Sequence, residues 1–417
     1  MPRITAAAAV LAMGVSLFAA DAQKLLESLK SRYKSERDNA VAQIIKLDDN
    51  ARAAIVPDLV KLVEAGDWQP MRCAALALQG IGPAAAPAAA KLKPALIAAI
   101  RQPRPAAVEL LQTTIAKVSP GAQKGMVAEV AALLKDKDDG VKKHACVALE
   151  RIGPDAGAAA PALLEAAKSK VPTVAAAAAE ALAAVGPPAD AAAPLAAMVE
   201  SDNTAVALAA MKALGAMGAG AAGAVPQVAK LANASRNELV ASEAVRALGR
   251  LGPKGTDAVI GTLGSRVRGA GEAAMGVLVG MGDKAVPLLT AALSGPRKLE
   301  AAEALLRLGK GGEKQALVTL RAACDSKNSQ ESRAAIETLG RWGSRLEDKA
   351  LRNDAAAAVG QVLAGQNDSA KEAAARALGS FGPESPAAVP ALEKAVKDSN
   401  QRVAKAAKAS LDRIKSQ

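Results

Sequence analysis

Aromatic side chains are almost missing from this chain of 417 residues, which has two Trp, one Tyr and two Phe. A single large hydrophobic core normally uses aromatic side chains to fill its volume. The hydrophobic class nevertheless makes up 51% of the sequence, and Ala is its most frequent member. This composition argues against one thick core and favours many thin helices that pack closely.

Histidine and cysteine are also scarce. The one histidine is His144, and the three cysteines are Cys73, Cys146 and Cys324. A single histidine argues against most metal sites and against a Ser-His or Cys-His nucleophile. The cysteines are far apart in sequence and form no Cys-x-x-Cys pair, so we expect each to be a small buried side chain. The sequence predicts no catalytic residue, no cofactor site and no metal site.

The first residues differ from the rest of the chain. Residues 1–22 combine a basic Arg3, an apolar run over residues 4–20 and a small-x-small site at Ala20-Asp21-Ala22. This pattern is typical of a cleaved signal peptide, so we expect residues 1–22 to be a signal peptide. An uncleaved anchor helix is the alternative. Export would place the mature protein, residues 23–417, in the periplasm or outside the cell.

From residue 37 onward one sequence motif recurs. It is a helix-forming segment that usually ends in Gly. We call the residue after the last apolar position of each copy its anchor, and most anchors are 32 to 34 residues apart. The position before the anchor is always apolar, the fourth before it is Leu or Ile, and the eighth before it is Ala in every copy except one, where it is Leu111. These offsets share one face of a helix. The anchors are Asp48, Gly82, Ser119, Gly153, Gly186, Gly218, Gly252, Gly282, Gly309, Gly343, Gly382 and Lys415.

The residues around each anchor predict a second helix. Gly at the anchor is expected to adopt a left-handed conformation that ends the first helix, and a following Pro cannot continue it. A further Pro opens the second helix in several copies, namely Pro161, Pro194, Pro226 and Pro390, with Pro57 one position later. A polar turn follows, in which we expect Asp139, Asp202, Asp325 or Asp398 to cap the next first helix.

One pair of short helices cannot bury its apolar stripe, whereas stacked pairs share a continuous core. The sequence therefore predicts an all-α fold over residues 23–417, a right-handed α-solenoid of about eleven to twelve stacked helix pairs. We expect an extra N-terminal helix over residues 23–36. Anchor spacing is irregular over residues 252–309 and 343–382, where we expect a kink or a change of pitch.

Two stretches carry a family resemblance, "VKKHACVALERIGPDAGAAAPALLEA" and "VRALGRLGP". They resemble HEAT repeats, specifically the short HEAT-like type first named for phycobilisome lyases. The resemblance covers roughly Arg37 to the C-terminus. It implies a superhelix whose second helices line the concave surface. The named relatives include lyases that attach bilins to partner cysteines, but no residue of this chain points to that activity.

The chain has a net charge of +12. Some of its basic residues stand two before an anchor, where a cation favours the C-terminal end of a helix dipole. These residues are Lys46, Lys117, Arg151, Arg250, Arg307, Arg341 and Arg413. A second basic set lies at offsets that share one face of the second helices, which we expect to be exposed. It is either an ordinary solvated helix face or the candidate partner-binding surface. Its members are Lys61, Arg101, Lys168, Lys230, Lys394 and Lys397.

Three functions are compatible with these observations. The first is a non-catalytic interaction scaffold that binds a protein or peptide partner along the concave face of the solenoid. The second is a binder of an anionic polymer or a membrane surface through the basic second helices. Nucleic acid fits poorly, because stacking aromatic side chains are lacking and the protein is expected to be exported. The third, a lyase-type enzyme accessory, rests on the resemblance alone. A monomer is favoured.

Overall fold

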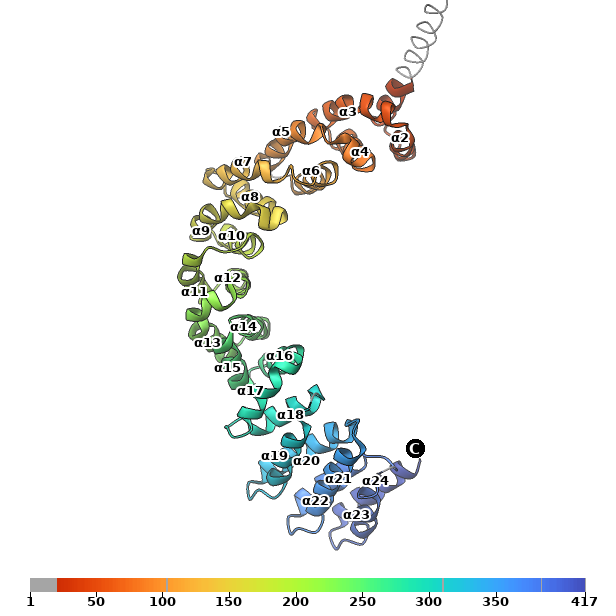
Figure 1. Cartoon of the computed structure of the whole chain (residues 1–417), viewed down its shortest axis with the longest axis vertical. Helices are drawn as coiled ribbons and strands as arrows, with labels where there is room; N and C mark the ends of the chain where they lie inside the picture. The colour runs from red at the N-terminus through yellow and green to blue at the C-terminus, as the bar shows by residue number, and fades with distance from the viewer. Residues whose placement is uncertain (1–20, 103, 310, 384, 417) are drawn as a thin grey trace, which may run out of the picture. The chain divides into compact units, whose positions relative to one another are not determined.

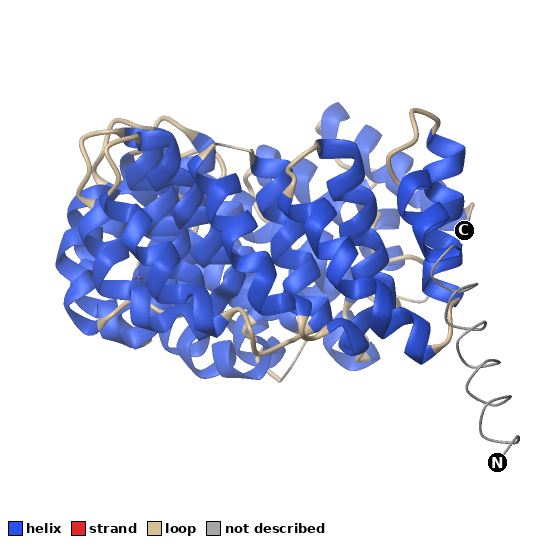
Figure 2. Cartoon of the chain, turned by 90° about the horizontal axis from the view of Figure 1, so that it is seen from above, coloured by secondary structure: helices blue, strands red, loops and turns tan. Residues whose placement is uncertain are grey.

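The computed structural model describes residues 21–102, 104–309, 311–383 and 385–416, and these residues form helices and turns without any strand (Figures 1 and 2). The expected signal peptide therefore lies, apart from residues 21 and 22, outside the described residues. The all-α solenoid is confirmed: helices alternate along the chain as repeated pairs. The first helix of each pair has an even number and the second an odd number.

The even helices are α2 (Lys34–Lys46), α4 (Trp68–Ile81), α6 (Pro105–Val118), α8 (Asp139–Ile152), α10 (Pro172–Val185), α12 (Thr204–Met217), α14 (Glu238–Arg250), α16 (Ala270–Gly280), α18 (Lys298–Leu308), α20 (Ser329–Trp342), α22 (Asp368–Leu378) and α24 (Gln401–Lys415). The odd helices are α3 (Asp49–Glu64), α5 (Ala88–Arg101), α7 (Val127–Ala132), α9 (Ala160–Ala167), α11 (Ala192–Val199), α13 (Val225–Ala234), α15 (Pro253–Thr262), α17 (Ala285–Ala292), α19 (Glu313–Cys324), α21 (Lys349–Val362) and α23 (Ala388–Ala395). Short 3-10 turns lie between them, namely η1 (Gly82–Ala85), η2 (Lys124–Met126), η3 (Leu133–Lys135), η4 (Gly153–Ala159), η5 (Ala189–Ala191), η6 (Gly218–Ala224), η7 (Gly282–Lys284) and η8 (Gly343–Arg345).

Most anchor glycines lie at or next to the end of an even helix, as expected, but Gly382 lies beyond the end of α22 at Leu378. Eight of them have a positive φ, for example +69° at Gly82 and at Gly153. Gly343 is an exception, since its φ is −60° and α20 continues directly into η8. Glycine is required there by space: a Cβ on Gly343 would lie 2.9 Å from the Cβ of Ala355 on α21.

The capping residues differ from those expected. Asp138 rather than Asp139 caps α8, and its carboxylate accepts a hydrogen bond of 2.7 Å from the amide of Gly140. Asn400 rather than Asp398 caps α24. The cap is the last extended residue before each helix, because only there does the side chain face the free amides of the first turn. Pro57 lies inside α3, which begins earlier, at Asp49.

The core consists of the predicted stripe of Ala and Leu. Leu149 and Leu182, four residues before their anchors, are fully buried, as are Ala145 and Ala178. The small Ala side chains let neighbouring even helices approach closely, and α10 packs extensively against both α8 and α12. Within each unit, neighbouring repeats thereby share one continuous apolar layer.

The chain divides into two compact units, residues 1–217 and 218–417, with the boundary between Met217 and Gly218. This boundary lies outside both stretches of irregular anchor spacing. Over residues 252–309 the short spacing reflects short helices, since α16 and α18 have 11 residues each. The expected helix over residues 23–36 is also divided: residues 21–28 are helical, and α2 starts at Lys34.

The stretch Thr204–Ala234 is long and apolar enough, by composition, to cross a membrane. Half of its most apolar window is buried inside the protein, and the left-handed Gly218 ends α12 within it. Burial and interruption are both expected of repeat helices that form a core, so its composition is explained by packing.

Candidate partner-binding surfaces

The six basic residues expected to form one surface are distributed over separate odd helices. Lys61 lies on α3, Arg101 ends α5, Lys168 follows α9, Lys230 lies on α13, Lys394 lies on α23 and Lys397 follows it. Only Lys394 and Lys397 share a repeat, and none of the six lies on α15, α17, α19 or α21. The six residues therefore form no continuous stripe.

Two of these lysines have acidic partners within their own helical turn. Lys61 Nζ lies 2.8 Å from Asp58 Oδ1, and Lys168 Nζ lies 2.5 Å from Glu165 Oε1. The hydrogen bond to Asp58 raises the pKa of Lys61 above its usual range. Such pairs reduce the charge that the odd helices offer to an anionic partner.

The odd helices do not line the inner side of the first unit. Figure 1 shows α4, α6, α8 and α10 along the inner side of that unit's curve, and α3, α5, α7 and α9 along the outer side. The expectation that second helices line a concave surface is therefore wrong for this unit. In this unit α10 contacts α8 and α12 closely, whereas α9 makes no comparable contact with α7 or α11. Small Ala side chains allow this close approach, so the row of even helices is the shorter, inner one.

Basic residues in the last turn of even helices reach across to the preceding even helix. Arg151 on α8 lies 3.1 Å from Glu109 on α6, and Arg307 on α18 lies 4.0 Å from Glu272 on α16. These cations occupy the favourable end of the helix dipole, as expected, but they also link successive repeats.

The cysteines and the histidine fill structural positions. All three cysteines are buried, and burial raises the pKa of Cys146 to about 12 and that of Cys324 to about 12. Their thiols are therefore neutral at pH 7 and unsuited to nucleophilic attack. His144 Nδ1 lies 2.7 Å from the carbonyl oxygen of Gly140, one turn back on α8. Within the described ranges no group of His, Cys, Asp or Glu is arranged to hold a metal ion.

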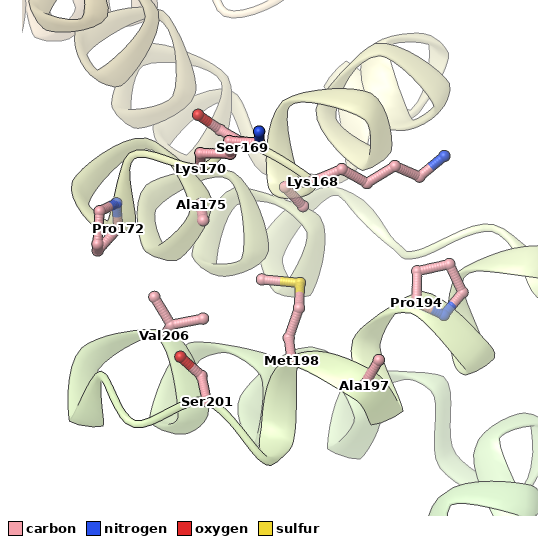
Figure 3. A pocket seen from close by; sticks show the side chains of 11 residues that line it. Lys168, Ser169, Lys170, Pro172, Ala175, Pro194, Ala197, Met198, Ser201 and Val206 are labelled. Atoms are coloured by element: carbon pink, nitrogen blue, oxygen red, sulfur yellow. The ribbon is translucent and has the colours of Figure 1, made fainter.

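One groove of about 500 Å³ lies in the first unit. It includes Lys168, a member of the predicted basic set, together with Met198 and Val206, which the sequence did not single out. It lies between the turn that joins α9 to α10 and the segment from α11 to the start of α12 (Figure 3). Met198 and Val206 project toward Ala175 across the apolar floor, and Lys168 and Lys170 lie at its margin. We call this the Met198 groove. Met198 itself is only half-buried at the end of α11, so the core leaves part of this apolar side chain available for contact.

Comparison with known proteins agrees with this architecture. The pattern of the HEAT repeats family matches residues 127–204 and 356–417. The solved structure of yeast importin-beta (Kap95p) superposes with a TM-score of 0.51 at 14% identity, covering 95% of this chain and 61% of that one. A second structure, of Kap95p binding to RanGDP, gives a TM-score of 0.50 at 16% identity, covering 95% of this chain and 55% of that one. This chain thus spans less than two thirds of the importin-beta length. No curated protein matches the sequence.

Proposed function

Because the chain carries HEAT repeats in both of its units, we propose that it is a non-catalytic scaffold that binds a segment of a protein or peptide partner. The observation that supports this function best is the Met198 groove, in which an apolar floor is bordered by two lysines. A repeat array offers such grooves at regular intervals, because the turns and helix ends of successive pairs lie next to each other. The similar fold of importin-beta, solved in an assembly with RanGDP, gives an example of a solenoid that holds a protein.

The chemistry of the Met198 groove favours an apolar side chain followed by an acidic group. Met is flexible and polarizable, so it adapts to an inserted side chain of varied shape. Val206, on the same side as Met198, and Ala175, on the opposite side, complete the apolar contact surface. Lys170 makes no ion pair in the part of the chain that the structure describes, and its ammonium is available to a carboxylate of the partner.

The anionic-polymer hypothesis depends on the basic odd helices, and the geometry gives it less support. A long polyanion is held by cations that follow one another along a surface. Here Arg101 on α5 and Lys168 beside α9 are separated by α7, and Lys168 is paired with Glu165. A scaffold that recognises short segments at separate sites fits this distribution better.

Selection of displayed peptides tests the proposed function. A library of random peptides is selected on the full chain, and the affinity of the selected peptides is then measured for two variants. We expect Met198→Asp to weaken binding about tenfold or more, because it places a charge in the apolar floor. Leu239→Asp is the matched control, since Leu239 is an exposed apolar residue on α14 outside the groove. Failure to select any peptide, or equal losses in both variants, would contradict the proposal.

We also propose that residues 1–22 direct export and are then removed. The support is their signal-peptide pattern, which differs in sequence from the repeats that follow. We expect N-terminal sequencing of the protein purified from its native cell to start at Gln23. Recovery of a cytoplasmic protein that still begins at Met1 would disprove export.

A further inference from the structure

Two grooves adjoin each other on the exposed face of the last three even helices. The first, the α20–α22 groove, has a volume of about 530 Å³ and is lined by Glu337, Gly340, Arg341, Arg345, Arg376 and Ala377, among others. The second, the α22–α24 groove, has a volume of about 490 Å³ and is lined by Glu372, Arg376, Arg402, Lys405, Ala409 and Arg413, among others. Arg376 on α22 borders both, so the two grooves form one surface.

Cations outnumber carboxylates on this surface. Glu372 is engaged by Arg376, whose Nη2 lies 2.7 Å from Glu372 Oε1, and by Arg402 at 4.0 Å. Glu337 is engaged by Arg333, which lies 2.8 Å away on the same helix. Both carboxylates are thus already neutralised by neighbours.

Three cations of the surface remain available. Arg341, Lys405 and Arg413 have no acidic partner among the residues that the structure describes. They come from α20 and α24, on either side of Arg376. An arriving carboxylate would therefore meet positive charge in both grooves without first breaking an internal ion pair.

The floor of the surface consists of small residues. A Cβ on Gly340 would lie 2.7 Å from the Cβ of Ala377, so the backbones of α20 and α22 approach each other closely at this point. Ala377 and Ala409 continue this low floor across α22 and α24. Long arginine side chains border this floor. The backbone of an extended partner segment can therefore approach the floor, while the guanidinium groups contact the side chains of that segment.

Trp342 fixes one of these arginines at the groove. The guanidinium of Arg345 lies 5.1 Å from the centre of the Trp342 ring, and Arg307 lies 4.9 Å from it. The indole Nε1 donates a hydrogen bond of 3.0 Å to Glu303 Oε1. Because two cations and a carboxylate already engage this ring, it is not free to stack on a base, whereas Arg345 is held in position.

From these features we propose that the surface formed by the α20–α22 and α22–α24 grooves binds an acidic peptide segment through its carboxylates. The proposal rests on the proposed function and specifies the chemistry of the partner at a second site. A single-stranded nucleic acid fits less well, because no aromatic ring lines either groove to stack on bases. Arginine pairs with carboxylates in bidentate geometry, which suits isolated acidic side chains.

The spacing of the repeats indicates how far apart the acidic side chains of such a segment would be. Packed helices lie about 8–10 Å apart, and an extended chain advances about 3.3 Å per residue. A segment that crosses from α20 to α24 would therefore present an acidic side chain to each groove about every third residue.

Fluorescence anisotropy with a defined probe tests this proposal on the full chain. The probe is a labelled peptide of about twelve residues with Asp at every third position and Gly or Ser between, long enough to cross three helices. We expect Arg341→Glu and Arg413→Glu each to weaken its binding about tenfold or more, because each replaces an available cation of one groove with a repulsive charge. Circular dichroism and thermal melting of each variant check that the helices remain folded.

Arg250→Glu provides the matched control. Arg250 also lies two residues before its anchor, in the last turn of α14, but it lines neither groove. The change in net charge is identical, so we expect Arg250→Glu to retain the affinity of the unmodified chain within about twofold. Equal losses in Arg250→Glu and Arg341→Glu would overturn the proposal, as would tighter binding of a thymidine oligonucleotide of equal length. Neither result would affect the Met198 groove, whose test uses selected peptides and a different variant.

Discussion

Replacement of Leu149 by Ala is expected to lower the free energy of unfolding by about 2–5 kcal/mol, measured by urea denaturation. Leu149 lies on α8 and is among the largest fully buried side chains of the chain. Its removal leaves a cavity in the layer that α8 shares with α10, and the surrounding Ala residues are too short to fill it. We expect the loss to appear as an earlier midpoint in urea, because a shared core transmits the defect to neighbouring repeats.

His144→Ala on the same helix is the control. The His144 ring is half-buried and contacts the carbonyl of Gly140 within its own helix, so its loss should change the unfolding free energy by no more than about 0.5 kcal/mol. A larger loss for His144→Ala than for Leu149→Ala would show that the buried face of α8 is assigned incorrectly.

Two glycine substitutions in the second unit should have effects of opposite sign. Gly255 lies in the first turn of α15, and a Cβ there would collide with the carbonyl oxygen of Leu248. The backbone must shift to admit it, so Gly255→Ala is expected to cost about 1–3 kcal/mol of stability. Gly276 lies inside α16, and a Cβ added there would have no neighbouring atom within 4 Å. Gly276→Ala should therefore stabilise by about 0.5–1 kcal/mol through helix propensity.

Thermal melting of the two variants measures both effects. The unfolding midpoint should fall for Gly255→Ala and rise for Gly276→Ala. Stabilisation by Gly255→Ala would mean that α15 does not pack closely against the end of α14.

The repeat and its register were readable from the sequence because both depend on local chemistry. A stripe of Ala and Leu at helical spacing, ended by a left-handed glycine, needs no long-range information. Gly343 shows the limit of this reasoning. It stands at an anchor, yet it is required by the approach of Ala355 from α21, a contact between two different helical segments that the local pattern does not encode.

The binding surfaces were less predictable from the sequence, because each groove is formed by side chains of different helices that come together only when the repeats pack. The sequence placed Arg341 and Arg413 in the last turns of helices, where they are indeed found. It did not show that both border grooves next to Arg376, since that requires α20, α22 and α24 to be packed side by side. The sequence shows the charge of Lys168, whereas its proximity to Met198 arises only because the turn after α9 lies beside the end of α11.

Photo-crosslinking of the acidic peptide tests most directly that this chain binds a partner segment on the surface formed by the α20–α22 and α22–α24 grooves. The peptide carries one photoreactive residue at its centre, and the adducts are located by mass spectrometry after digestion of the full chain. We predict adducts on α20, α22 and α24, concentrated around Arg376. Adducts on the odd helices α19, α21 or α23, or adducts spread evenly along the chain, would contradict it.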